Sequence, residues 1–145
     1  MSEAALSAIR SLPSWRLGRV AARGRTLVAE ALAAEGVKTW HHVVLSAVRD
    51  LAPVAQADLG RGVGLDPKDL VGVLNDLQAG GHVVRAPDPK DRRKNAVSLT
   101  PDGERLLRRC EAAVRTANET LLAPLSAAER DRFMSLLIRI SDLDA

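Results

Sequence analysis

Apolar side chains recur at helical spacing over most of the chain, and proline and glycine mark the breaks. The first such segment follows a Ser11–Ser14 start that contains Pro13, and Gly36 ends it. Proline is favoured at the first position of a helix and glycine just beyond its end. The pattern predicts a helix over 11–36 after a short flexible N-terminal stretch. Its apolar positions are Leu17, Val20, Ala21, Gly24, Leu27, Val28 and Ala31.

Two shorter helices are predicted next. Thr39 can cap the first of them, which Pro53 stops, and the second would run from about Ala55 to Gly62 before a turn at Gly64. Both have apolar residues on one face, as expected of helices that cover a core. In the first they are Val43, Val44, Ala47, Val48 and Leu51.

The clearest helix start in the chain follows at Asp66. This residue can serve as cap, Pro67 takes the first helical position, and Asp69 lies in the first turn, where negative charge complements the helix dipole. The helix shows one apolar face and is closed by Gly80-Gly81. The residues of that face are Leu70, Val73, Leu74 and Leu77.

After this helix, the spacing of the apolar residues no longer fits a helix. The runs 82–85 and 96–99 favour two short strands joined by a polar loop, which together predict a β-hairpin over 82–99. Thr100-Pro101 restarts a helix that continues to Pro124, and a Ser-Ala-Ala-Glu capping box at Ser126 opens a last helix. The apolar stripe of that helix is Phe133, Leu136, Leu137 and Ile140.

Composition agrees with a mainly α fold. The chain has 145 residues, about the size of one domain, with 46% hydrophobic but only 2% aromatic residues. Its apolar content is mostly Ala, Leu and Val, which favours helices over a β-sandwich or barrel. We therefore expect a mainly α protein with a small β-hairpin and about six helices.

Positive charge is concentrated in one segment. The whole chain has 21 basic and 18 acidic residues, a net charge of +3, whereas residues 82–109 hold eight basic and four acidic residues, an excess of +4. Such a local excess favours a polyanionic partner. The lone Cys110 excludes an internal disulfide. No apolar run is long enough to span a membrane, and the N-terminus lacks the layout of a signal peptide. A cytoplasmic location is therefore expected.

Two short helices around a glycine-containing turn, followed by a hairpin with a basic loop, have the order of a winged helix-turn-helix. On the 66–81 helix, Lys68 would donate to guanine or phosphate and Asn75 would pair with adenine, while Gly72 leaves room for the backbone. Taken alone, this face is better explained as an ordinary solvated surface; the hairpin that follows it reverses that preference in favour of DNA. The candidate recognition residues are Asp66, Pro67, Lys68, Val71, Gly72 and Asn75.

The hairpin loop mixes two acids with a dense group of bases. An Asp there can fix one Arg while another Arg reaches a narrow minor groove, whose negative potential attracts guanidinium. A solvated hairpin could also carry such a mixture. The candidate wing residues are Arg85, Asp88, Lys90, Asp91, Arg92, Arg93 and Lys94.

The run Asp-Pro-Lys-Asp-Arg-Arg at 88–93 and the run Val-Ser-Leu-Thr-Pro-Asp-Gly at 97–103 resemble the wing and following helix of the MarR family of transcriptional regulators. The resemblance extends to Leu65-Asp66 and Leu70–Gly81. It implies Arg92 as the minor-groove residue, with Asp88 or Asp91 as its buttress. Where the family usually places Ser, Thr or Arg donors at the start of the recognition helix, this chain has Asp66, Pro67, Lys68 and Asp69, and Gly at 72.

The resemblance also implies a homodimer on a palindromic DNA site and a small aromatic or phenolic effector. Residues 1–145 would form one domain, with dimerisation helices at 11–36 and 101–145 and a winged lobe at 39–100 whose wing spans 82–99. The apolar stripes of the terminal helices are more than one lobe can cover, which favours the dimer over packing of those helices within one chain.

A candidate effector site joins the start of the first helix to that of the second. An aromatic wall with guanidinium groups would suit an aromatic carboxylate, although a solvated basic face with Trp40 packed as a staple is an equal alternative. The residues are Trp15, Arg16, Arg19, Trp40, His41 and His42.

We expect a double-stranded DNA-binding regulator, a repressor released by a ligand, and no membrane partner. The sequence holds no phosphate-binding glycine loop, nucleophile elbow or metal-ligand cluster, so an enzyme, a cofactor and a metal are not expected. The alternative is a winged helix that contacts another protein without a ligand response.

Overall fold

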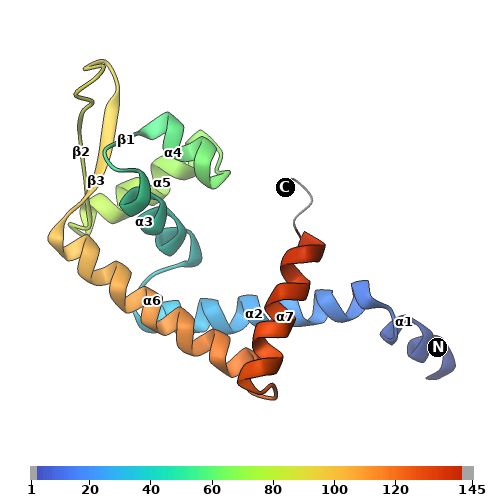
Figure 1. Ribbon diagram of the computed structural model, residues 1–145. Helices are drawn as coiled ribbons and strands as arrows, with labels where there is room; N and C mark the ends of the chain where they lie inside the picture. Colours follow the sequence, from blue (N-terminus) through green and yellow to red (C-terminus); the bar gives the residue numbers. More distant parts are fainter. Residues whose placement is uncertain (1–2, 142–145) are drawn as a thin grey trace. The chain divides into compact units, whose positions relative to one another are not determined.

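A computed structural model, which describes residues 3–141, is mainly helical with a small antiparallel sheet (Figure 1). This confirms the predicted fold class. The helices are α1 (Glu3–Arg10), α2 (Pro13–Ala34), α3 (Thr39–Leu51), α4 (Gln56–Val63), α5 (Pro67–Ala79), α6 (Pro101–Leu121) and α7 (Ala127–Ser141). The strands are β1 (Val54–Ala55), β2 (Val83–Pro87) and β3 (Asn95–Leu99). The outermost positions of the predicted 1–145 domain, 1–2 and 142–145, lie outside the described residues.

The chain divides into two compact units. Residues 28–114 form one, which we call the winged lobe; it contains α3, α4, α5, the sheet, the end of α2 and the first part of α6. The described residues up to Leu27 and from Arg115 onward form the other, which we call the terminal unit. Within residues 3–141, no helix combines the length and apolar character needed to cross a membrane.

One apolar core holds the winged lobe together. On α5 the predicted inward face is confirmed, since Leu70, Leu74 and Leu77 are at most 3% exposed. Burying each such side chain contributes about 1.5–3 kcal/mol. These leucines pack with apolar residues of the other lobe elements, namely Leu32, Val44, Leu45, Val48, Leu59, Val83, Val97, Leu106, Leu107 and Cys110.

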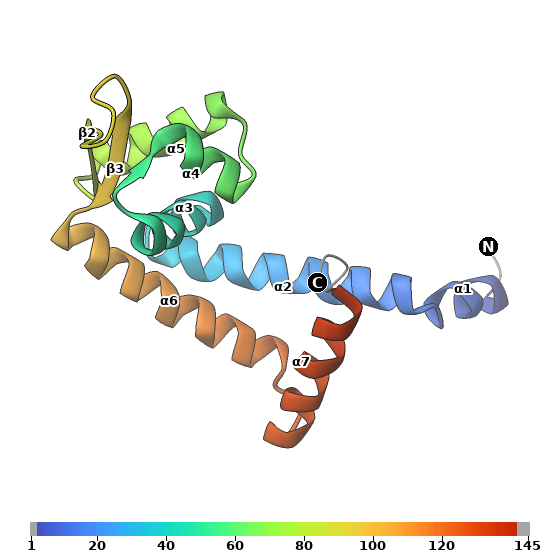
Figure 2. The ribbon, with the colours of Figure 1, turned by 45° about the horizontal axis from the view of Figure 1, so that its top comes forward.

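The sheet has the strand order β1-β3-β2, and all its pairs are antiparallel. The hairpin register places Val83 opposite Leu99 and Pro87 opposite Asn95. Strand β1 adds Val54 opposite Val97 on the other edge of β3. The sequence did not reveal β1, because two residues show no periodicity, and the third predicted helix begins at Gln56 because Ala55 is held in the sheet. Figure 2 shows β3 leading directly into α6.

Two glycines set the angles at which α4 and α5 end. Gly64 and Gly81 have φ values of 72° and 77°, the left-handed region that glycine adopts without a steric cost. After Gly81, the His82 N–H donates to the Leu77 carbonyl at 2.8 Å, which satisfies a backbone acceptor at the helix end. Gly64 therefore starts the turn between α4 and α5, and Gly81 leads the chain from α5 into β2.

The wing is joined to α6 by a tight junction. The Thr100 hydroxyl donates to the Gly81 carbonyl at 2.6 Å and accepts from the Gly103 N–H at 2.9 Å, which caps α6. A Cβ added at Gly103 would lie 1.9 Å from the His82 carbonyl oxygen, so only glycine fits. This contact gives a physical reason for the Thr-Pro-Asp-Gly sequence at 100–103.

Two predicted helix starts differ from the structure. Residues Glu3–Arg10, expected to be flexible, form α1, with Arg10 in its last turn, where a cation suits the helix dipole. Helix α3 begins at Thr39 itself, so Thr39 is not its cap. The position before it is Lys38, whose N–H donates to Nδ1 of His41 at 2.9 Å, so a side chain inside the helix satisfies that donor.

In the terminal unit, the predicted capping box at the start of α7 is confirmed: the Ser126 N–H donates to Glu129 Oε1 at 2.8 Å and the Glu129 N–H donates to Ser126 Oγ at 3.2 Å. No residue of α7 is buried. Its Ile138 and Ile140 are 55% and 62% exposed. Large apolar side chains on both sides of α7 are therefore exposed within the described part of the chain.

Candidate nucleic-acid interface

Helix α5 begins as the sequence predicts. Asp66 Oδ1 accepts the Lys68 N–H at 2.8 Å, and Pro67 occupies the first turn. The Asp66 carboxylate thus satisfies a donor that would otherwise be open at the helix N-terminus. Asp69 lies in the same turn and keeps that end acidic.

The face of α5 opposite the core is solvent-accessible. Lys68, Val71, Gly72 and Asn75 are all exposed, and no atom lies within 4 Å of a Cβ built on Gly72. The structure therefore brings these predicted recognition residues together on one open face. A major groove is wide enough to admit an α-helix, so such an open face can approach base edges.

Arg85 connects the hairpin to this face. From β2 its Nη2 donates to Asn75 Oδ1 at 2.7 Å and its Nε donates to Gln78 Oε1 at 2.5 Å. Arg85 was predicted as a wing contact, but its guanidinium is engaged by α5. Gln78 was missed by the sequence analysis, although its position three residues after Asn75 places both on one side of the helix.

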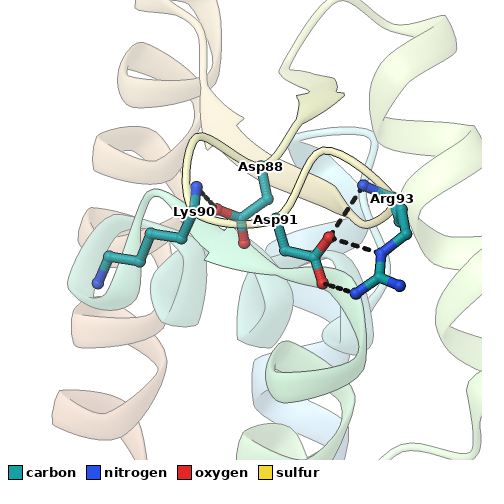
Figure 3. A network of polar contacts seen from close by, with 4 residues as sticks. All are labelled: Asp88, Lys90, Asp91 and Arg93. Carbon is teal, nitrogen blue, oxygen red and sulfur yellow. Dashed lines mark hydrogen bonds and ion pairs between the residues drawn. The ribbon is translucent and has the colours of Figure 1, made fainter.

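The β2–β3 loop is held by its two aspartates (Figure 3). Asp88 Oδ1 accepts the Lys90 N–H at 2.8 Å, and Asp91 Oδ1 accepts the Arg93 N–H at 3.1 Å. The Asp88 N–H also donates to the Lys94 carbonyl at 2.8 Å, which closes the loop. In Figure 3 the Lys90 ammonium points away from both carboxylates. The loop therefore has a defined backbone with its acidic groups used internally.

Asp91, one of the two residues expected to support Arg92, pairs with Arg93 in this structure, with Oδ1 3.1 Å from Nε and Oδ2 3.4 Å from Nη2. An Asp in a turn of this kind bonds the residue two positions later, which from Asp88 and Asp91 leads to Lys90 and Arg93. The hydrogen bonds from Arg93 lower the pKa of Asp91, so the carboxylate is ionised at neutral pH. Lys90, Arg92, Arg93 and Lys94 are all exposed.

The predicted effector residues fall into both units. In the terminal unit, the guanidinium of Arg19 lies 5.3 Å from the ring centre of Trp15, a cation–π contact. A cavity of about 570 Å³ is lined there by Arg10, Trp15, Arg16, Arg19 and Val20. Guanidinium groups around an indole suit an anionic aromatic molecule.

In the winged lobe, Trp40, His41 and His42 lie at the start of α3. Trp40 is 44% exposed. His41 Nε2 lies 3.1 Å from Asp76 Oδ2 on α5, a partner that the sequence analysis missed. Burial lowers the pKa of His42, Glu111 opposes this shift, and Arg49, which is hydrogen-bonded to Glu111, adds to it. The two histidines thus have different surroundings.

Cys110 is buried in the lobe core, and burial raises the pKa of its thiol. This environment suits a structural thiol, since the thiolate is the reactive form. Across residues 3–141, no three His, Cys, Asp or Glu side chains are arranged to hold a metal ion.

A helix-turn-helix of α4 and α5, a hairpin with a basic loop and a free helix face define the class of winged helix-turn-helix DNA-binding proteins. The model of the MarR family matches residues 35–94. The repressor Rv2887 of Mycobacterium tuberculosis is 31% identical over 124 residues, which cover 86% of this chain and 89% of Rv2887. The chain belongs to the MarR family, whose members are transcriptional regulators rather than enzymes.

Further relatives are similar over most of the chain. The repressor NicR of Pseudomonas putida is 36% identical over 102 residues; the match covers 70% of this chain and 65% of the length of NicR. The crystal structure of Rv2887 with DNA has a TM-score of 0.77 at 29% identity and covers 90% of this chain and 98% of Rv2887. Another Rv2887 structure contains p-aminosalicylic acid, with a TM-score of 0.73 at 28% identity, covering 90% of this chain and 99% of Rv2887.

The structure of BpsR from Bordetella bronchiseptica has a TM-score of 0.76 at 28% identity and covers 92% of this chain and 96% of BpsR. It concerns regulation of DNA binding by 6-hydroxynicotinic acid.

Proposed function

We propose that this protein is a homodimeric repressor that binds a palindromic operator and that a small aromatic ligand releases it. The observation that carries the proposal is the pairing of an ordered, cationic β2–β3 loop with an open face on α5. A winged helix binds DNA with these two surfaces, the helix in the major groove and the loop at the adjacent backbone or minor groove.

The wing supplies most of the affinity. Asp88 and Asp91 are engaged in the loop itself, which leaves the cations of Lys90, Arg92 and Lys94 to face phosphates. Arg92 is the residue that reaches the minor groove, because Arg93 is paired with Asp91.

The base contacts come from α5. Lys68 donates to guanine or phosphate, and Asn75 contacts a base with its amide held by Arg85. Because Asp66 is bonded to the helix start and Asp69 lies beside it, this end of α5 repels phosphate more than a helix start rich in hydroxyl groups does. Specific binding thus depends strongly on the base contacts and on the wing.

The terminal segments 11–36 and 101–145 form the dimer interface. The uncovered apolar side chains of α7 and of α2, among them Ile138, Ile140 and Leu17, support this assignment. A two-fold dimer presents two recognition helices to successive major grooves, about 34–36 Å apart, which a palindromic site matches.

The ligand is an aromatic acid. Rv2887 has a structure with p-aminosalicylic acid and BpsR one concerning 6-hydroxynicotinic acid, and both ligands are aromatic acids that also carry hydrogen-bond donors. In this chain the cluster of Trp15, Arg16 and Arg19 in the terminal unit is one candidate site.

Selection of bound fragments from a random DNA pool, followed by sequencing, tests the proposal. We expect an inverted repeat with half-sites about 10 base pairs apart, and binding that weakens steeply as salt rises. Enrichment of no sequence, together with salt-insensitive retention, would instead indicate a winged helix used for protein contact.

A further inference from the structure

Val71 is an apolar side chain on the face of α5 that the proposed function directs at the major groove. It is 40% exposed, although burial of a valine would stabilise the fold. Pro67, one turn earlier on α5, is exposed as well and lines the same surface hollow. The apolar group that base pairs display in the major groove is the C5 methyl group of thymine. An exposed valine at this position is therefore suited to contact a thymine.

Asn75 lies one turn after Val71 on the same side of α5. Residues four apart on a helix are neighbours, with Cβ atoms about 5–6 Å apart. Arg85 Nη2 donates to Asn75 Oδ1 at 2.7 Å, so the accepting atom of this amide is engaged by the hairpin. The Nδ2 group is the end left for DNA, and it can only donate. The helix thus offers a hydrogen-bond donor and an apolar group side by side.

The engagement of Oδ1 changes which base Asn75 is suited to contact. A bidentate contact with adenine needs the amide oxygen to accept from the N6 amino group, and that oxygen is held by Arg85. Thymine displays an O4 acceptor together with its C5 methyl group. Guanine displays acceptors without a methyl group, and cytosine displays an amino donor. Of the four bases, thymine alone matches both groups on the helix.

We propose that Val71 and Asn75 together select one thymine in each half-site, with the methyl group against Val71 and O4 accepting from Asn75 Nδ2. The inference rests on the proposed function and names the base that this part of α5 reads. Val71 is then a specificity-determining residue. Lys68, earlier on the same face, is exposed and contacts a neighbouring base pair or a phosphate.

Uracil substitution tests the methyl contact, because uracil differs from thymine only in lacking the C5 methyl group. Each thymine in both strands of one half-site of the selected operator is replaced in turn by deoxyuridine, and the Kd of the protein is measured by fluorescence polarisation. We expect one replacement to raise the Kd about fourfold, the ratio that loss of one buried methyl group produces. Equal Kd values for all the replacements and the unmodified operator would overturn the proposal.

A double-mutant cycle assigns the methyl contact to its residue. Val71→Ala removes the apolar partner, so the sensitive operator and its uracil counterpart should bind this variant equally. Val84→Ala is the matched control, since it makes the same change at a valine of β2 that is 49% exposed, and it should keep the fourfold preference for thymine. A fourfold preference that persists in Val71→Ala would overturn the role of Val71.

5-Methylcytosine, paired with guanine at the sensitive position, tests the contact with O4. It keeps the C5 methyl group but has an amino donor where thymine has O4. We expect the Kd to rise about tenfold relative to thymine, within the range for a wrong base, and this penalty to become smaller in Asn75→Ala. Equal Kd values for thymine and 5-methylcytosine would overturn the O4 contact.

The outcomes separate this inference from the proposed function. If selection yields no operator, the proposed function fails and the assignment of thymine fails with it. An operator that binds tightly and is insensitive to both modified bases supports the proposed function and overturns the assignment of thymine alone.

Discussion

The guanidinium of Arg85 on β2 donates a 2.7 Å hydrogen bond to the side-chain oxygen of Asn75 on α5. Guanidinium can only donate, so this contact fixes which end of the Asn75 amide faces the hairpin. The amide nitrogen of Asn75 is then the end turned away from Arg85. The wing strand thereby orients the side chain that we assign to base contact.

Replacing Arg85 by Met should reduce sequence discrimination more than affinity. Without its Arg85 partner the Asn75 amide can rotate, and we expect the preference at one base pair of each half-site to fall by about tenfold, the lower part of the range for a bidentate contact. Fluorescence polarisation on the selected operator and its single-base variants measures this. Arg108→Met, an exposed α6 change, is the matched control, and a loss uniform across all sequences would contradict the assignment.

Arg92→Ala should weaken binding to every sequence by a similar factor. Loss of one groove contact reduces the slope of log K against log salt by about one. Arg93→Ala should have a smaller effect, because Arg93 is paired with Asp91 in the free protein. A salt series with both variants decides the point: equal slopes for wild type and Arg92→Ala would exclude Arg92 from the interface.

Gly103→Ala should destabilise the fold strongly. The added methyl group would overlap the His82 carbonyl oxygen, and relief requires a shift of the wing junction. We expect a loss of about 1–3 kcal/mol or more, as in other overpacked sites. Gly72→Ala is the control, since its Cβ meets nothing within 4 Å, and should stabilise by about 0.5–1 kcal/mol. Urea unfolding of both variants gives the comparison.

His42 should make the protein less stable in mild acid. Burial lowers its pKa from the ordinary value of 6.5, so below about pH 6.5 the unfolded chain binds this proton before the folded chain does. The free energy of unfolding is therefore unaffected by His42 above that pH and decreases as the pH falls toward the folded pKa. His42→Gln should reduce the change in the urea denaturation midpoint between pH 7 and pH 5. If the midpoint changes with pH as much in the variant as in the wild type, His42 is not the cause of the acid sensitivity.

Ile140→Glu should convert the dimer to a monomer. This side chain is 62% exposed on α7, and a charge at an apolar two-fold interface is placed there twice. Analytical ultracentrifugation should report half the wild-type mass. Ser135→Glu adds the same charge at an exposed position of α7 that lies about 140° around the helix from Ile140, and it should leave the mass unchanged.

The parts of the fold that were predictable depend on neighbours in sequence. Helix α5 was located from Asp66, Pro67 and its closing glycines because caps and helix ends are local signals. Strand β1 was not, because Val54 is defined as a strand only by pairing with Val97, over forty positions away.

The same distinction applies to the site. The wing residues and the open face of α5 followed from local patterns, whereas the engagement of Arg85 by Asn75 and Gln78 depends on how β2 crosses α5. The pairing of Asp91 with Arg93 has a local cause: the turn geometry of Asp91 favours the residue two positions later, and charge proximity alone does not reveal that preference.

The internal hydrogen bonds of the β2–β3 loop bear on the thermodynamics of binding. A disordered loop would lose about 1–2 kcal/mol of conformational entropy per residue on being fixed against DNA. Asp88 and Asp91 impose much of that order during folding, before any DNA is present. The entropy of ordering the loop is therefore lost when the free protein folds and not when it binds DNA. The charge contacts of the wing then contribute more to the free energy of association than they would from a disordered loop.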